Sequence, residues 1–196
     1  MSHLNVPEVL TPGARQKIIE KYGADLVEKR GQTAEQRLIA SYAVASYFDE
    51  LLAEGTNRKA DSVLSTALSV AAECVERTTG KGSDKEIRLI RAGGRLLCQA
   101  VILHANICDA AKNKRIKRGQ AKLLKKAIKR TTADSIEAFH DSQVMFMGDA
   151  KDQEFARRIL GKARGDLKTL EHSLVNHERQ NLRKKHSKHR KQRKEP

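Results

Sequence analysis

The chain contains no proline between Gly13 and Glu195, and this limits the folds open to it more than any other feature. The proline-free span is rich in Ala, Leu, Lys, Arg, Glu and Gln, all of which favour the α-helix. Of the 196 residues, 39% are hydrophobic, which is enough for one domain with a buried core. We therefore expect an all-α fold: a single bundle-like domain of about six or seven helices.

The sequence divides into a helical domain and two terminal segments. We predict a flexible N-terminus over residues 1–10, a helical domain over residues 11–178 and a disordered tail over residues 179–196. The first helix is expected to begin at Thr11-Pro12, because proline is favoured at the first helical position. Thr33 and Gln36 have the spacing of a capping box and are expected to begin the second helix.

A central helix is predicted to begin at a second capping box, Ser83 with Glu86, and to run to Cys108. Between Leu96 and Ile107 this helix is apolar on nearly all sides. Such a pattern is typical of a helix that is surrounded by other helices. The helix that follows the basic residues 112–130 is expected to begin at an N-cap formed by Thr132 or Asp134.

The last helix carries an apolar stripe from Ala156 to Leu174 with a regular 4,3,4,3,4 spacing. Its members are Ala156, Leu160, Ala163, Leu167, Leu170 and Leu174. The spacing favours either a seam against the rest of the bundle or a coiled-coil contact. We keep both interpretations, so a homo-oligomer formed through the Ala156–Leu174 stripe is a second hypothesis.

The formal net charge of +15 comes from two short segments. Residues 112–130 hold ten Lys and Arg residues and no acidic residue, and residues 179–196 hold nine basic residues and one acidic residue. The rest of the chain is neutral or slightly acidic. Charge gathered in blocks indicates dedicated electrostatic surfaces, and a cationic surface most often binds nucleic acid.

Residues 112–130 are predicted to form an amphipathic basic helix, which Gly119 ends or bends. Ile116, Leu123, Leu124, Ala127 and Ile128 would dock on the core, and all basic side chains except Lys117 would lie on the other side. The candidate nucleic-acid-binding residues of this segment are Lys112, Lys114, Arg115, Lys117, Arg118, Lys122, Lys125, Lys126, Lys129 and Arg130.

The tail from Arg179 has a single large apolar residue, Leu182, and cannot bury enough surface to offset its ordering entropy. We expect it to be disordered when free. Its candidate nucleic-acid-binding residues are Arg183, Lys184, Lys185, Lys188, Arg190, Lys191, Arg193 and Lys194.

Neither basic segment contains an aromatic residue, so base stacking is not expected there. The sequence predicts binding of RNA or DNA through phosphate contacts, in packaging, remodelling or ribonucleoprotein scaffolding. An alternative is a helical protein-interaction or oligomerisation subunit whose basic segments hold an acidic partner. Other interpretations are a solvated helix face, a solubility or targeting tail, and an anionic-membrane binder, which the lack of large aromatics on the basic helix disfavours.

Other chemistry has little support in the sequence. We predict no catalytic residues, no metal site and no cofactor. His104 and Cys108 lie one helical turn apart without a further metal-binding motif, and are interpreted as core residues. The three cysteines are an odd number and lie in apolar or alanine-rich surroundings, so we interpret them as reduced core residues of an intracellular protein. The longest run without a charged residue, Leu96 to Cys108, is too short to span a membrane, so we expect a soluble protein.

Overall fold

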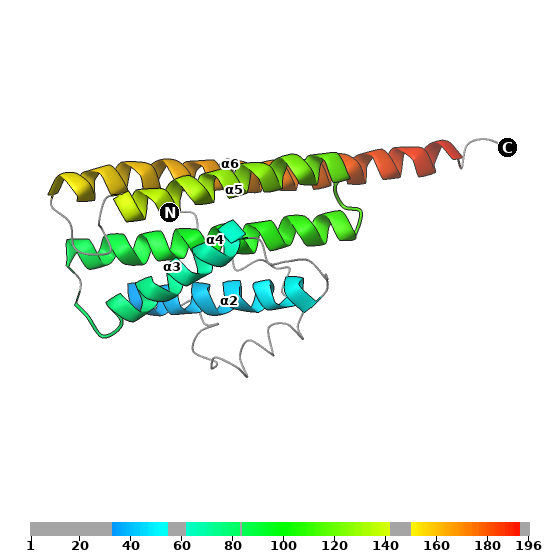
Figure 1. Ribbon diagram of the computed structural model, residues 1–196. Helices are drawn as coiled ribbons and strands as arrows, with labels where there is room; N and C mark the ends of the chain where they lie inside the picture. Colours follow the sequence, from blue (N-terminus) through cyan, green and yellow to red (C-terminus); the bar gives the residue numbers. More distant parts are fainter. Residues whose placement is uncertain (1–32, 55–61, 83, 142–149, 193–196) are drawn as a thin grey trace.

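The structure, a computed structural model, describes residues 33–54, 62–82, 84–141 and 150–192 (Figure 1). These ranges contain five α-helices and no strand, so the prediction of an all-α fold is confirmed. The helices are α2 (Ala34–Glu54), α3 (Ser62–Thr78), α4 (Lys85–Lys112), α5 (Arg118–Asp141) and α6 (Ala150–Gln192). The flexible N-terminus predicted for residues 1–10 and the helix predicted from Thr11 lie outside the described residues. The count of six or seven helices is therefore not confirmed.

The predicted central helix is α4, which packs against each of the other four described helices. Leu97 and Val101 are each 1% exposed, and Ile107 is fully buried. Figure 1 shows α2 below α4 and the pair α5 and α6 above it. The predicted burial of this helix between Leu96 and Ile107 is confirmed.

Two adjacent glycines let neighbouring helices approach α4 closely. A Cβ atom added at Gly93 would overlap the ring of Phe139 on α5. One added at Gly94 would lie 2.7 Å from the Cβ of Cys74 on α3 and 2.9 Å from the Cδ1 of Leu38 on α2. The glycine pair therefore sets the distance of α4 from three other helices.

The start of α2 follows the predicted capping box. The backbone N–H of Thr33 donates to Oε1 of Gln36 at 2.8 Å, and the backbone N–H of Gln36 donates to Oγ1 of Thr33 at 3.2 Å. The start of α4 differs from its prediction. Asp84 occupies the N-cap position, and Glu86 accepts a hydrogen bond from Gln153 of α6 at 3.1 Å. Glu86 thus joins two helices.

The loop between α3 and α4 is held by Arg91, which is 5% exposed. Its guanidinium donates to the carbonyl oxygens of Thr78 at 2.6 Å, Lys81 at 2.8 Å and Gly82 at 3.2 Å. It also pairs with Glu35 of α2 at 3.0 Å. Arg91 of α4 therefore links the loop and the end of α3 to α2 through these hydrogen bonds and the ion pair.

The basic segment 112–130 is interrupted between α4 and α5, and not at Gly119, where a break or bend was predicted; Gly119 lies within α5. Lys112 is the last residue of α4, and Lys114 takes a left-handed conformation with φ = 54°. The N–H of Arg115 donates to the carbonyl oxygen of Ala110 at 2.8 Å, and the N–H of Lys114 donates to that of Ala111 at 3.2 Å. These two bonds form a Schellman motif, which ends a helix.

The new helix, α5, continues through the position where we predicted another helix start. Thr132 is 1% exposed, and its hydroxyl donates to the carbonyl oxygen of Ile128 at 2.8 Å within the same helix. Ser135 is buried in the same way and donates to the carbonyl oxygen of Thr131. Their burial and their bonds to the preceding turn override the capping signal of Thr132 and Asp134.

The Ala156–Leu174 stripe forms a seam within the chain. All its members belong to the hydrophobic core or pack against it, so this stripe is not free to mediate oligomerisation. α6 then continues without interruption to Gln192, and residues 193–196 lie outside the described residues. The predicted disorder of the tail from residue 179 is therefore not confirmed. Extending an existing helix through Lys, Arg and Gln avoids the cost of nucleating a new one.

Candidate nucleic-acid interface

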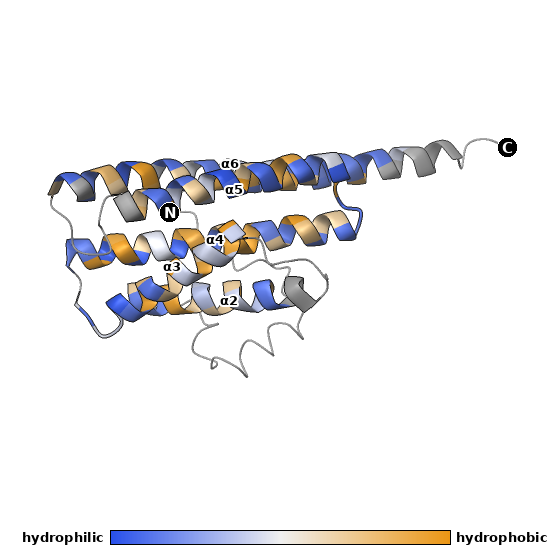
Figure 2. Ribbon diagram, in the orientation of Figure 1, coloured by the Kyte–Doolittle hydropathy of each residue, from blue (hydrophilic) through white to orange (hydrophobic). Residues whose placement is uncertain are grey.

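The turn between α4 and α5 is fixed to α6 close to the start of the basic tail. Arg115 pairs with Glu178 at 2.6 Å, and its carbonyl oxygen accepts a hydrogen bond from the side chain of Asn181 at 3.0 Å. Gln120 and His177 are 2.9 Å apart between Nε2 and Nδ1. These contacts bring together two basic segments that are separated by about 60 residues in the sequence. Both lie at the same end of the bundle in Figure 1, and Figure 2 shows hydrophilic residues at the turn and on the adjoining part of α6.

Arg115 was predicted to contact nucleic acid, and the structure gives it a different role. Its guanidinium is half-buried and forms ion pairs with both Asp109 and Glu178. A phosphate would have to compete with two carboxylates for this side chain. We therefore remove Arg115 from the candidate binding residues and assign it to the support of the turn.

The outer side of α5 carries a line of exposed cations, named here the α5 strip: Arg118, Lys122, Lys126 and Arg130. Successive members are four residues apart, so they follow one another at about 6 Å along the helix axis. Lys125 and Lys129 are half-buried at the edges of the strip. Of the other predicted residues, Lys112, Lys114 and Lys117 are exposed beside the turn.

Leu123 was predicted to dock on the core, and this prediction is wrong. It is 71% exposed, whereas Leu124 and Ile128 are buried as expected. Adjacent residues of a helix point about 100° apart, so the helix cannot bury Leu123 with the same face that buries Leu124 and Ile128. Leu123 instead lies next to Lys122 among the exposed residues of the strip.

The basic tail is an extension of α6 as far as Gln192. Arg183 and Lys184 are exposed, which suits their predicted role. Lys185, Lys188, Arg190 and Lys191 lie in the same helix, and Arg193 and Lys194 lie outside the described residues. The exposed cations Arg183 and Lys184 thus follow directly after Asn181, which is hydrogen-bonded to the turn.

Cations on the outer side of α6 were missed by the sequence analysis. Residues 131–178 have a slightly acidic balance, so no basic surface was expected there. In the structure, five basic side chains of this helix are exposed, as is Glu154, whereas Lys168 and three carboxylates are half-buried. The exposed cations are Lys151, Arg157, Arg158, Lys162 and Arg164, and the half-buried carboxylates are Asp166, Glu171 and Glu178. A helical-wheel projection of charge would have revealed this separation.

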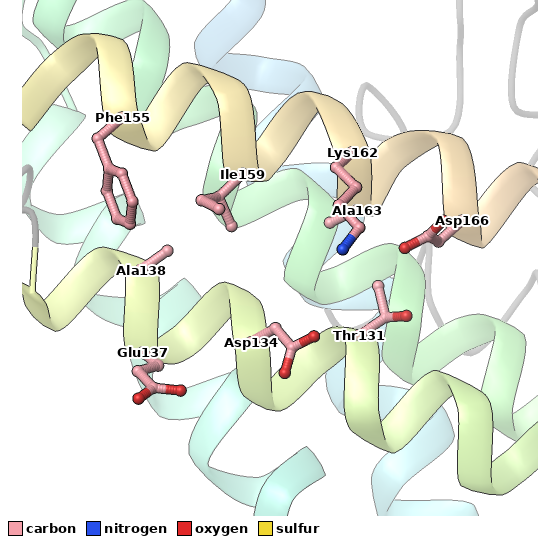
Figure 3. A pocket seen from close by; sticks show the side chains of 9 residues that line it. All are labelled: Thr131, Asp134, Glu137, Ala138, Phe155, Ile159, Lys162, Ala163 and Asp166. Atoms are coloured by element: carbon pink, nitrogen blue, oxygen red, sulfur yellow. The ribbon is translucent and has the colours of Figure 1, made fainter.

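A shallow groove between α5 and α6 marks where the α5 strip ends (Figure 3). Its volume is about 310 Å³. It is lined by Thr131, Asp134, Glu137 and Ala138 of α5 and by Phe155, Ile159, Lys162, Ala163 and Asp166 of α6. Three carboxylates against one ammonium group make this surface unfavourable for a phosphate. The outer side of α5 therefore changes from basic to acidic after Arg130.

Cys74, Cys98 and His104 are buried in the core. Burial raises the pKa of the Cys74 thiol to about 12 and raises the pKa of Cys98 further. Sγ of Cys108 lies 3.9 Å from Nδ1 of His104, which is buried. In the part of the chain that the structure describes, no three His, Cys, Asp or Glu side chains gather as a metal site would require.

Comparisons with protein-family models, with curated proteins and with solved structures find no match to this chain. None of the described helices combines the length and the apolar character needed to cross a membrane.

Proposed function

We propose that this protein binds RNA or DNA through the phosphate backbone, as a non-catalytic packaging, remodelling or scaffolding protein inside the cell. The observation that carries the proposal is the attachment of the α4–α5 turn to α6 through Arg115, Glu178 and Asn181. This attachment holds the start of α5 close to the basic end of α6, so the α5 strip and the tail cations could act together on one polyanion. A polyanion that follows both groups of cations, the candidate binding surface, would meet both basic segments at once.

The residue types of this surface favour binding with weak sequence preference. Lys and Arg neutralise phosphates, while base reading requires side chains that enter a groove. No aromatic residue lies in either basic segment to stack on bases. The helical spacing of the α5 strip holds its charges in a line, so we expect it to favour the shape of one type of backbone over another.

The alternative is an interaction subunit that holds an acidic protein partner with the same cations. The hypothesis that this subunit forms oligomers through the Ala156–Leu174 stripe loses support, because the stripe is packed in the core of its own chain. The material that copurifies with the protein distinguishes nucleic-acid binding from binding of an acidic protein. A nucleic-acid binder brings along nuclease-sensitive material that absorbs at 260 nm, whereas a binder of acidic protein does not.

The proposal is tested by fluorescence anisotropy with labelled 30-base-pair duplexes of two unrelated sequences, in DNA and in RNA. The strip variant changes Arg118, Lys122, Lys126 and Arg130 to Gln, which leaves the buried side of α5 intact. We expect the dissociation constant to rise at least tenfold at constant salt, because about four phosphate contacts are lost. The two sequences should give similar constants.

The matched control variant changes Lys81, Lys85, Lys151 and Arg157 to Gln. These four residues are also exposed: Lys81 lies in the loop before α4, Lys85 at the start of α4, and Lys151 and Arg157 in the first part of α6, away from the α4–α5 turn. The net charge falls by the same amount, so a response to total charge alone would affect both variants equally. That equality, or an absence of binding by the wild-type protein, would refute the proposed surface.

A further inference from the structure

The groove between α5 and α6 has an apolar wall that the bundle leaves open. Phe155 is 38% exposed and Ile159 is half-buried, and both line the groove from α6 (Figure 3). Neither side chain belongs to the hydrophobic core or to the Ala156–Leu174 stripe that packs inside the chain. An open apolar wall of this kind is a docking surface where a partner of matching chemistry exists.

The charges of the groove select a cationic partner. Asp134 and Glu137 are exposed on the α5 side, and Asp166 is half-buried on the α6 side. None of these three carboxylates has an ion pair or a hydrogen bond within the part of the chain that the structure describes. Lys162 is the one cation among the described lining residues, so the lining keeps a net negative charge. A fitting partner therefore combines positive charges with an exposed apolar side chain.

The chain itself presents such a surface near the end of α6. Arg179, Leu182 and Arg183 occupy positions i, i+3 and i+4, so they share one face of the helix, named here the tail face. All three are exposed, and Leu182 is 52% exposed. A leucine between two arginines matches an apolar wall beside carboxylates, because guanidinium groups form charge-assisted hydrogen bonds with carboxylate oxygens.

The tail face of one molecule cannot reach the groove of the same molecule. α6 is one continuous helix, and Arg183 follows Lys162 by 21 residues within it. At the helical rise per residue, the two positions are about 30 Å apart along the axis. Figure 1 shows the end of α6 extending beyond the other helices. The tail face is therefore available only to the groove of another molecule.

We propose that the groove between α5 and α6 binds the tail face of a second copy of this chain. Leu182 of one copy packs against Phe155 and Ile159 of the other, and the two arginines of the tail face pair with Asp134 and Glu137. Since the groove and the tail face are different surfaces, the contact is head-to-tail and repeats from copy to copy unless a ring closes. The inference goes beyond the proposed function, because this contact joins copies of the protein and needs no nucleic acid.

Sedimentation velocity of the full chain, after nuclease treatment and at constant salt, tests the contact. We expect the wild-type protein to be monomeric at low micromolar concentration and to form dimers and longer species toward roughly 500 µM, as expected for a small contact. Asp134→Lys, the groove variant, should lower the association constant at least tenfold, because it opposes the arginines with a like charge. Glu137→Lys at the same edge of the groove should act in the same way.

The control is Glu76→Lys, which makes the same change of charge at an exposed position on α3. It should associate as the wild type does. A loss of association equal to that of the groove variant would show a response to net charge and overturn the proposal.

Mixing two variants tests the head-to-tail arrangement. The tail variant changes Arg179, Leu182 and Arg183 to Gln and keeps an intact groove, whereas the groove variant keeps an intact tail face. Each variant should be monomeric alone. An equimolar mixture should form a 1:1 dimer and no larger species, because one groove and one tail face remain in each pair.

A wild-type protein that stays monomeric at all concentrations would overturn the proposal. A mixture of the two variants that does not dimerise would overturn it as well, as would association of the tail variant by itself, because the groove would then hold a different surface. These measurements contain no nucleic acid. They decide on the contact whether or not the protein binds a duplex, so the two proposals fail separately.

Discussion

The guanidinium of Arg115 donates to the carboxylate of Glu178 at 2.6 Å, which joins the turn after α4 to α6 just before the basic tail. Asp109 holds the other side of the same guanidinium. Arg115 thus holds the turn in position, and the turn positions the exposed lysines and arginines beside it. Because the side chains of this network are only partly exposed, salt screens it less than it screens the lysines around it.

We predict that Glu178→Gln will lower the free energy of unfolding by about 1 kcal/mol, the usual range for a partly exposed ion pair. The Tm should fall by roughly 2–4 °C at low salt, and by less in 1 M salt, where charges are screened. Glu154→Gln is the control, because its pair with Arg157 is longer, 3.4 Å, and more exposed. Identical melting curves for the two variants would show that the Arg115–Glu178 pair does not stabilise the turn.

Two glycine-to-alanine variants should have opposite effects on stability. Gly93→Ala should cost several kcal/mol, because its new methyl group overlaps the ring of Phe139 in a close-packed core. Gly161→Ala should gain about 0.5–1 kcal/mol, since it lies in a helix with nothing within 4 Å of the added atom. Chemical denaturation measures both. A stable Gly93→Ala protein would mean that α4 and α5 do not cross at this glycine.

Two substitutions of Lys114, the left-handed residue of the turn, test its backbone conformation separately from its charge. Lys114→Gly should raise the free energy of unfolding by about 0.5–1 kcal/mol, because glycine adopts the φ of 54° without strain. Lys114→Ala removes the same charge and keeps the strain, so it should give no gain. Equal stability of the two variants, measured by urea denaturation, would contradict the Schellman motif at the end of α4.

The elements that the sequence predicted well are those in which local and tertiary signals agree. The Thr33 and Gln36 box has both of its hydrogen bonds, and most of the apolar span from Leu96 to Ile107 is buried. The break in the basic segment was predicted at Gly119 and not after Lys112, because the left-handed position holds lysine where glycine or asparagine is usual. The start predicted at Thr132 was wrong because packing against the core kept α5 continuous there.

The candidate site was predicted in part. The linear pattern of charge located both basic segments, but it could not reveal that Arg115 is engaged by Asp109 and Glu178. Glu178 is 63 residues away from Arg115 in the sequence, and only the fold brings them together.

The salt dependence of duplex binding tests the central claim, that the α5 strip and the basic end of α6 act together on the phosphate backbone. Dissociation constants would be measured from 50 to 300 mM salt for the wild type, the strip variant and the matched control variant. We predict that log K falls against log salt with a slope of roughly −4 to −5 for the wild type and the control, and of roughly −0.5 to −1.5 for the strip variant, which loses about four phosphate contacts. A flat response of the wild type, or equal slopes for the strip variant and the wild type, would contradict the account.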